Sequence, residues 1–465
     1  MQRRNFLKVA GLAGLSLMGP WGPGGRASAD PAVWGGPFLL HMHASGGWDP
    51  TLFCDGKLTA EGSTPEYENR LVTAVEVVNG VPVPSATATG KYLLTSGGAA
   101  LEDPVHFFQT IGRDVLVVNG IDTQTNSHET GVQGLGCGHN DVELPAIAAL
   151  FAGTVALERK VPMAFLASGA YNRTGDVIAP SRFPGNKVDL LTDPFKGVPA
   201  NEKGLLTDLG AKRILELRAQ RMAELQGKST LPRERRTLAA LAESTKSGDA
   251  INLLKSVTEG PPPAIDSFVN DLAPDTRGAL TAVTNGVSRF VDLGRPLETM
   301  LHCFAAGISI SATWAQGGFN THAQHDQNQT SALASFVARI RYVQLRAAQL
   351  GLKDKLYVLV TSDFGRTPKY NTGNGKDHWN VTSALLMGPG IRGGRAIGKT
   401  DEGHKALNVS KSNASENVPA YEPNGTRIHP SHVHRELRRV LGVEKAPFIG
   451  QFVLPSTHGP LPLLA

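Results

Sequence analysis

Residues 356–366 read LYVLVTSDFGR, a mostly apolar run that passes directly into polar residues. The run is apolar on both faces, which is typical of a strand in a covered parallel sheet. A segment of helical periodicity, Thr330 to Leu350, precedes it, and Gly351 follows as a C-cap. Five more runs have the same character: PFLLHMH (37–43), VLVVNG (115–120), PMAFLA (162–167), GISISATW (307–314) and SALLMG (383–388). A strand, a helix and a strand in this order predict a βαβ unit, and hence an α/β fold with a mostly parallel sheet.

Outside these runs, the chain changes character in its middle. From about residue 204 to residue 300 the pattern is helical and highly charged, as in GAKRILELRAQRMAELQG, and the turn GPPPA interrupts it. We interpret this segment as a helical insertion into one large domain that spans residues 30–465. Residues 85–100 and 405–427 are rich in small and polar side chains and are predicted to be surface loops.

The first 29 residues have the features of an export signal. Arg3 and Arg4 precede a short apolar run, and small residues end the segment at Ala29. The arginine pair followed by Phe6 and Leu7 is similar to the twin-arginine pattern, although Gln2 stands where Ser or Thr is usual. The apolar run is too short to span a membrane. We therefore expect the twin-arginine export machinery to deliver a mature chain without a transmembrane segment to the periplasm or the medium.

Charge and cysteine content exclude several classes of protein. Residues 1–29 contain four basic residues and no acid, so their removal lowers the formal net charge from +5 to +1. Without a basic stripe, a nucleic-acid partner is not expected. The three cysteines, Cys54, Cys137 and Cys303, include no CxxC pair, which argues against a zinc ribbon or a redox dithiol. Either all three are buried free thiols, or two of them form one disulfide.

Polar side chains follow the apolar runs where a ligand would sit in an open α/β sheet. Carboxylates and imidazoles from separate strand ends suit a divalent metal, and two ions could orient a phosphate or sulfate ester. The residues concerned are His41, His43, Asp49, Asp122, Ser127, His128, Asn320, His322, Asp326, Asp363, Arg366, Asp377 and His378.

Each of these residues also has a structural interpretation. A lone Asp after a strand, such as Asp363, is often a helix N-cap. His41 and His43 lie within an apolar run and are expected to pack in the sheet. His429, His432 and His434 are typical of a solvated helix start. The absence of GxSxG, GxGxxG and Walker patterns at strand ends argues against a serine esterase and a nucleotide-binding protein.

The C-terminal third of the sequence resembles a known family. The segments GGFNTHAQHDQNQ, LYVLVTSDFGRTPKYNTGNGKDHWN and SALLMGPGIRGG are similar to the motifs of the bacterial family called domain of unknown function 1501. Members of that family look distantly like the alkaline phosphatase and sulfatase superfamily. The resemblance implies a three-layer α/β/α fold with metals at the strand ends. It does not cover the helical insertion.

The resemblance also implies a set of metal ligands, namely Asp49, Asn320, His322, Asp363 and His378. Zinc is the expected ion, with magnesium, calcium and manganese as alternatives. The Asn/Gly loop at 371–375 would return His378 to the metal site, Asp377 would orient the imidazole or the loop, and Trp379 would close one side. This sequence departs from the family at Asn320, where Asp is usual, and at Asp363, where Glu is usual.

The superfamily further implies a hydroxyl nucleophile at a helix start. Ser127 is the candidate, with Thr123, Thr125 and Thr130 as rivals, and Arg366 or His128 would steady the anion. The expected activity is hydrolysis of a phosphate or sulfate ester on a small molecule or a polymer. The alternative is a non-catalytic envelope or surface protein with a degenerate metal site, which Asn320 favours.

Overall fold

A computed structural model describes residues 34–58, 69–86, 104–159, 161–182, 208–232, 234–235, 238, 287–418 and 422–464. The predicted export signal, most of the polar segment 85–100 and most of the predicted insertion lie outside these residues. The part of the insertion that is described contains α6 (Asp208–Lys228) and the start of α11 (Val287–Ala305). No helix in the described ranges combines the length and apolarity that crossing a membrane requires.

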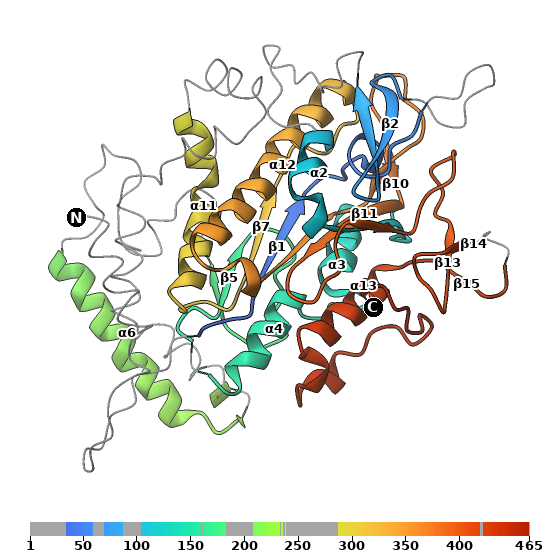
Figure 1. The fold of residues 1–465 in the computed structure, drawn as a ribbon. Helices are drawn as coiled ribbons and strands as arrows, with labels where there is room; N and C mark the ends of the chain where they lie inside the picture. The colour runs from blue at the N-terminus through green and yellow to red at the C-terminus, as the bar shows by residue number, and fades with distance from the viewer. Residues whose placement is uncertain are drawn as a thin grey trace, which may run out of the picture.

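An eight-stranded sheet forms the centre of the molecule, in the order β12-β4-β11-β8-β1-β7-β5-β6 (Figure 1). All of its strand pairs are parallel except those of β11, which runs antiparallel to β4 and to β8. The strands are β1 (Phe38–Ala44), β4 (Leu116–Asp122), β5 (Phe165–Ser168), β6 (Pro180–Arg182), β7 (Ser311–Gln316), β8 (Leu356–Ser362), β11 (Val381–Met387) and β12 (Arg395–Ile397). The six predicted strands are therefore all present, and the mostly parallel sheet is confirmed.

Helices cover both faces of this sheet, because neighbouring residues of one strand enter two different cores. On β1, Leu40 and Met42 pack in one core, and Leu39 packs in the other. The first core contains residues of α2 (Pro104–Ile111), α11 and α12 (His325–Gln349), and the second contains residues of α4 (Ile147–Ala156) and α13 (Pro430–Val440). This is the expected three-layer α/β/α arrangement.

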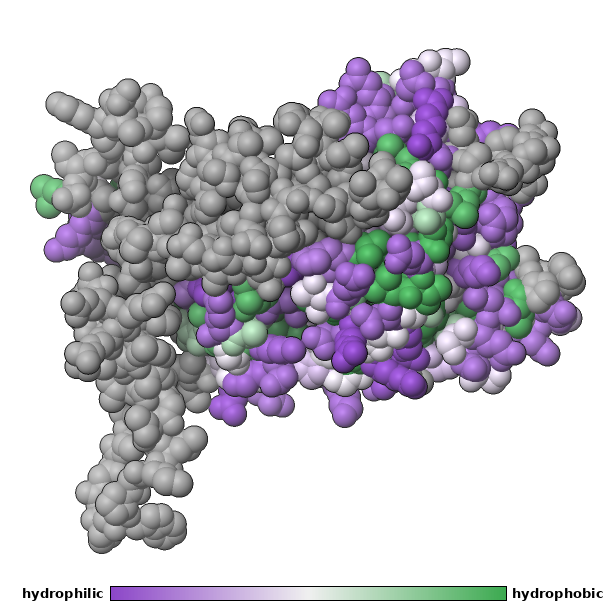
Figure 2. All heavy atoms as spheres, turned by 45° about the horizontal axis from the view of Figure 1, so that its top comes forward, coloured by the Kyte–Doolittle hydropathy of each residue, from purple (hydrophilic) through white to green (hydrophobic). Residues whose placement is uncertain are grey.

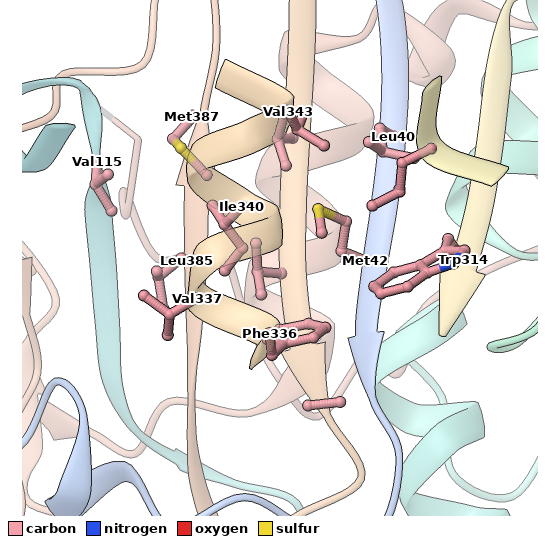
Figure 3. Packing of buried hydrophobic residues seen from close by; sticks show 14 of the residues in the cluster. Leu40, Met42, Val115, Trp314, Phe336, Val337, Ile340, Val343, Leu385 and Met387 are labelled. Carbon is pink, nitrogen blue, oxygen red and sulfur yellow. The ribbon is translucent and has the colours of Figure 1, made fainter. Parts of the chain in front are cut away.

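The long helix α12 shows why the helical period was readable from the sequence. Phe336, Val337 and Ile340 are buried in the same core as Met42 of β1 and lie between the helix and the sheet (Figure 3). The apolar stripe thus faces the core, as its spacing requires. The helix α11 also packs here through Leu297 and neighbouring residues, so this end of the predicted insertion contributes to the main core.

The remaining elements are short and lie around the sheet. They are α3 (His128–Cys137) and three small sheets, formed by β2 (Val72–Val78) with β3 (Val81–Ala86), by β9 (Gly365–Arg366) with β10 (His378–Trp379), and by β13 (Asn408–Ser410) with β14 (Asn417–Val418) and β15 (Gly425–Thr426). Five short 3-10 turns complete the described secondary structure: η1 (Pro50–Leu52), η2 (Gly112–Asp114), η3 (Lys353–Lys355), η4 (Val443–Lys445) and η5 (Ile449–Gln451). The described residues on the face in Figure 2 are mainly hydrophilic, around a group of hydrophobic ones. Cys54, Cys137 and Cys303 are buried free thiols.

Candidate functional site

Asp363 is the centre of a buried hydrogen-bond network just beyond β8. Its Oδ1 accepts a hydrogen bond from His43 Nε2 at 2.6 Å, and its Oδ2 accepts from His128 Nδ1 at 2.6 Å and from the Gly46 backbone N–H at 3.0 Å. Burial alone would raise the pKa of Asp363, but the hydrogen bonds from His43 and His128 outweigh it and hold the pKa below its ordinary value. Asp363 is therefore a carboxylate that fixes two imidazoles.

The turn after β1 can approach Asp363 only because Gly46 lacks a side chain. Gly46 has φ +119, and a Cβ there would lie 2.5 Å from the Asn320 backbone nitrogen. A left-handed backbone of this kind favours glycine. The parallel pairing of β1 with β8 brings the ends of the two strands together. The sequence SGGWD at 45–49 thus folds against the Asp363 carboxylate.

His128 and Ser127 lie at the start of α3, beside this network. The His128 side chain is 37% exposed and its ring contacts those of Phe364 and His378. Ser127 is the exposed N-cap residue of α3, and its side chain makes no capping hydrogen bond. Of the rival hydroxyls, that of Thr123 already donates to the carbonyl oxygens of Thr125 and Asn380.

His378, the first residue of β10, lies beside His128. Its Nδ1 donates to the Asn126 carbonyl oxygen at 2.7 Å, and its ring lies over that of Phe364 with centroids 4.3 Å apart. Burial lowers the pKa of His378, and the positive charge of Arg366 lowers it further. The imidazole is therefore held neutral, with its proton on Nδ1 and a lone pair on Nε2.

His322 faces His378 directly. The two Nε2 atoms are 2.9 Å apart, and His322 Nδ1 donates to Asp377 Oδ1 at 2.8 Å. When His322 is neutral, the carboxylate places its proton on Nδ1, so its Nε2 also carries a lone pair. Two lone pairs that face each other at this distance require a proton or a cation between them. Asp377 therefore orients His322, whereas the sequence suggested that it would orient the imidazole of His378 or the loop.

The Asn/Gly loop holds Asp377 and His378 in these positions. Asn371 Oδ1 accepts the backbone N–H groups of Gly373 and Gly375 at 2.9 Å, and its Nδ2 donates to Asp377 Oδ1 at 3.1 Å. A Cβ at Gly375 would lie 1.9 Å from the His322 backbone carbonyl. The glycine thus lets the loop touch the segment that carries His322. The loop therefore holds His378 opposite His322, while its predicted role as a tether to a metal site stays a prediction.

Asn320 lies between the imidazole pair and a buried arginine. Its Oδ1 is 3.3 Å from His378 Nε2 and accepts a hydrogen bond from Arg366 Nη2 at 3.0 Å. Arg366 is fully buried and also donates to the carbonyl oxygens of Gly47 and Lys376. Because its N–H groups bind the protein's own carbonyls, Arg366 holds the loops together. This geometry argues against the predicted contact between Arg366 and a substrate anion.

Asp49 lies at the same edge of the sheet but in a network of its own. Its Oδ1 accepts hydrogen bonds from Thr51, and its Oδ2 contacts Lys376 Nζ at 3.0 Å and His325 Nε2 at 3.1 Å. Burial would raise the pKa of Asp49, but Lys376 and His325 hold it well below its ordinary range. An ammonium therefore already neutralises this carboxylate. Trp379 donates from Nε1 to the His404 carbonyl oxygen, so its indole is tied to the 401–406 loop.

The five predicted metal ligands are consequently not assembled as one cluster. In the described part of the chain, no group of three or more His, Cys, Asp and Glu side chains could hold a metal ion. The physical reason is that Asp363 is shared by His43 and His128, and Asp49 is paired with Lys376. His322, His378 and the Asn320 oxygen remain close to one another.

Several participating residues were missed or discounted on the sequence. His43 packs within β1, as expected, but its Nε2 also binds Asp363. Thr361 links His43 Nδ1 and His41 Nε2 at 2.9 and 2.7 Å. The register of β1 against β8 places His43 beside Thr361, two residues before Asp363, and this register is a property of the folded sheet that the sequence does not show. Lys376 and Asn126 gave no signal, because their partners are distant in sequence.

Comparison with known proteins supports the family resemblance. Residues 283–430 match the model of a family described as protein of unknown function (DUF1501). This range includes Asn320, His322, Asp363 and His378, but not Asp49, Ser127 and His128. No curated protein matches the sequence at a significant level.

Similar solved structures include phosphatases and sulfatases. An alkaline phosphatase from the Antarctic bacterium TAB5 is 10% identical, with 88% of this chain and 99% of that chain covered and a TM-score of 0.34. A putative sulfatase from Bacteroides thetaiotaomicron is 9% identical, with 91% of this chain and 73% of that chain covered and a TM-score of 0.27. Likenesses of this strength say nothing about the activity of this chain.

Proposed function

We propose that the chain is an exported hydrolase of phosphate or sulfate esters that holds one divalent cation between His322 and His378. One observation carries this proposal: the two Nε2 atoms lie 2.9 Å apart while both Nδ1 atoms donate to fixed oxygens. A carboxylate or carbonyl behind each imidazole is the usual support of a metal-binding histidine. The Asn320 Oδ1, 3.3 Å from His378 Nε2, is the third donor.

The donor set fits a borderline cation such as zinc. Two imidazole nitrogens on a tetrahedral zinc lie about 3.3 Å apart, at Zn–N distances of about 2.0 to 2.1 Å, so a small separation of the two rings accommodates it. Imidazole also suits other first-row metals, whereas magnesium and calcium prefer carboxylates. Since Asp49 and Asp363 are bound to protein groups, the proposed site holds one cation.

The neighbouring residues are suited to the hydrolytic chemistry. His128 Nδ1–H is fixed on Asp363, which leaves the Nε2 lone pair of His128 to accept a proton from an attacking hydroxyl or water. Ser127 precedes it, exposed at the start of α3, and is the proposed nucleophile. A bound divalent cation would supply positive charge to the ester oxygens. Arg366, by holding Asn320, is a positioning residue rather than an anion contact.

The second candidate is a non-catalytic surface protein that keeps the fold. Asn320 favours it, because a neutral amide binds a divalent cation more weakly than a carboxylate does. The arrangement of His322, Asp377, His378 and Asn126 favours the hydrolase, since a scaffold has no need to aim two imidazole lone pairs at one point.

Turnover by the purified mature chain distinguishes the two candidates. The wild type should hydrolyse at least one ester in a panel of phosphate and sulfate monoesters supplied with zinc, manganese, magnesium or calcium. His378→Ala should reduce the rate by at least about 100-fold, because it removes a cation ligand. His106→Ala, on α2, is the control and should retain the rate. If the wild type hydrolyses no ester under any of these conditions, the second candidate, a non-catalytic surface protein, is supported.

A further inference from the structure

A second group of histidines lies away from the candidate site, where α13 begins. The His429 and His458 rings stack with centroids 4.1 Å apart, and the His432 ring lies 5.7 Å from His429 and 5.5 Å from His458. The sequence suggested a solvated helix start for His429 and His432. That prediction is wrong for His432, which is buried, while His429 and His458 are partly buried.

The hydrogen bond at the start of α13 requires a neutral His432 imidazole. His432 Nδ1 accepts the backbone N–H of His429 at 2.9 Å, which caps the helix. A protonated imidazole has no lone pair to accept this bond, and its charge would lie at the positive end of the helix dipole. His139, which would oppose protonation of His458 if it were itself charged, accepts two backbone N–H groups through Nδ1.

These rings join three parts of the chain. His429 Nδ1 donates to the Asp122 carbonyl oxygen at the end of β4, and His458 Nδ1 is 2.7 Å from Ser431 Oγ on α13. Arg435 Nη2 donates to the carbonyl oxygens of Pro455 and His458. The C-terminal segment is therefore fastened to the start of α13 by His458 and Arg435.

We propose that His429, His432 and His458 form an acid-sensitive clasp, which holds residues 455–458 on α13 when the imidazoles are neutral and releases them when the imidazoles are protonated. The proposal is independent of the hydrolase chemistry. It concerns only the four residues 455–458, since Leu454 before them and Leu461, Leu463 and Leu464 after them are buried in the second core.

The charges around the clasp oppose protonation. Burial lowers the pKa of His432 to about 3, with contributions from His429, His458 and Arg435. Burial also lowers the pKa values of His429 and His458.

The nearby charged groups do not reverse this effect. The Asp122 carboxylate favours a charged His429, but Arg427 binds that carboxylate at 3.3 Å and opposes the charge.

The sign of the pH effect follows from these lowered pKa values. A released imidazole takes up a proton near pH 6.5, whereas the stacked imidazoles do not. The clasp is therefore at full strength above pH 6.5 and weakens as the pH falls toward the lowered values. Each imidazole shifts the equilibrium toward release by up to about tenfold per pH unit in that range.

Local mobility of the segment tests the proposal in the full chain. A fluorophore that does not respond to pH is attached to Ser456→Cys, because the three native thiols are buried. Its anisotropy should fall between pH 7.5 and pH 4.5 with a dependence on more than one proton. The same label on Asp354→Cys, on η3, is the control and should not change.

Variants without titratable imidazoles test whether protonation of the clasp causes the fall in anisotropy. In the triple variant His429→Gln, His432→Gln, His458→Gln, the anisotropy should stay constant over this range, because glutamine can donate and accept without taking up a proton. If the triple variant does not fold at pH 7.5, His458→Gln alone should make the transition shallower. A constant anisotropy in the wild type, or an unchanged transition in the folded variants, would overturn the proposal.

Discussion

A substitution at Asn320 distinguishes the two proposed functions, the hydrolase and the non-catalytic surface protein. An Asn320→Asp substitution adds a carboxylate beside His378 Nε2, and Arg366 lies 3.0 Å from the same oxygen to balance the new charge. We expect the affinity for a divalent cation to rise by about tenfold or more, because a carboxylate is a stronger ligand than an amide. Isothermal titration of the metal-stripped chain measures this change. Equal affinities of the two proteins would show that Asn320 does not face the cation.

For single residues, the sequence indicated which side chains lie near one another better than it indicated what each side chain does. Asp377 was expected to orient the imidazole of His378 or the loop, and the imidazole that it binds is that of His322. Arg366 looked like an anion contact because it follows a strand, but its guanidinium is fully buried against backbone carbonyls. The difference depends on the path of the loops around Gly46 and Gly47, and that path is a property of tertiary structure.

At the scale of elements, the β9–β10 hairpin and its Asn/Gly loop bring His378 to His322. Gly375→Ala places a methyl group against the His322 carbonyl, where a Cβ would be 1.9 Å away, so either the loop or His322 must move. We expect the substitution to weaken cation binding by at least about 10-fold, since misoriented ligands lose affinity of this order. The matched control is Gly373→Ala, where the nearest atom would be 3.4 Å away. Titration of both variants with zinc measures the difference, and equal binding would contradict this role of the loop.

The elements themselves were largely predictable. The six apolar runs became strands of one sheet, and the stripe on residues 330–350 became the buried face of α12. The sequence could not show that β11 runs antiparallel, because a strand that is buried on both faces has the same composition in either direction. Nor could it show that α13 would bury His432 and His434, because short helix starts with several polar residues resemble exposed ones.

At the scale of the whole molecule, buried neutral histidines make the fold sensitive to acid. Burial lowers the pKa of His434 to about 4. This group contributes stability that is fully present above about pH 6.5 and is lost as the pH falls toward 4, in total roughly 3 kcal/mol. We expect the urea midpoint of the wild type to fall across this range. His434→Gln should show a smaller fall, and an equal slope in both proteins would exclude this cause.

Export is also a property of the whole chain. We propose that delivery depends on the pair Arg3 and Arg4, which precede the short apolar run of the leader. Replacing both by Lys should leave the precursor in the cytoplasm, as cell fractionation with antibody detection would show. A variant with one replacement is the control. Normal export of the double variant would mean that another route carries the protein.

The cation content of the purified mature chain tests the central proposal most directly, because it does not depend on knowing the ester. Elemental analysis of the wild type should find close to one divalent cation per chain, and we expect zinc. His378→Ala should retain less than about a tenth of this content, while His106→Ala should retain all of it. A wild type free of divalent cations after incubation with zinc, or an unchanged content in His378→Ala, would contradict a cation held between His322 and His378.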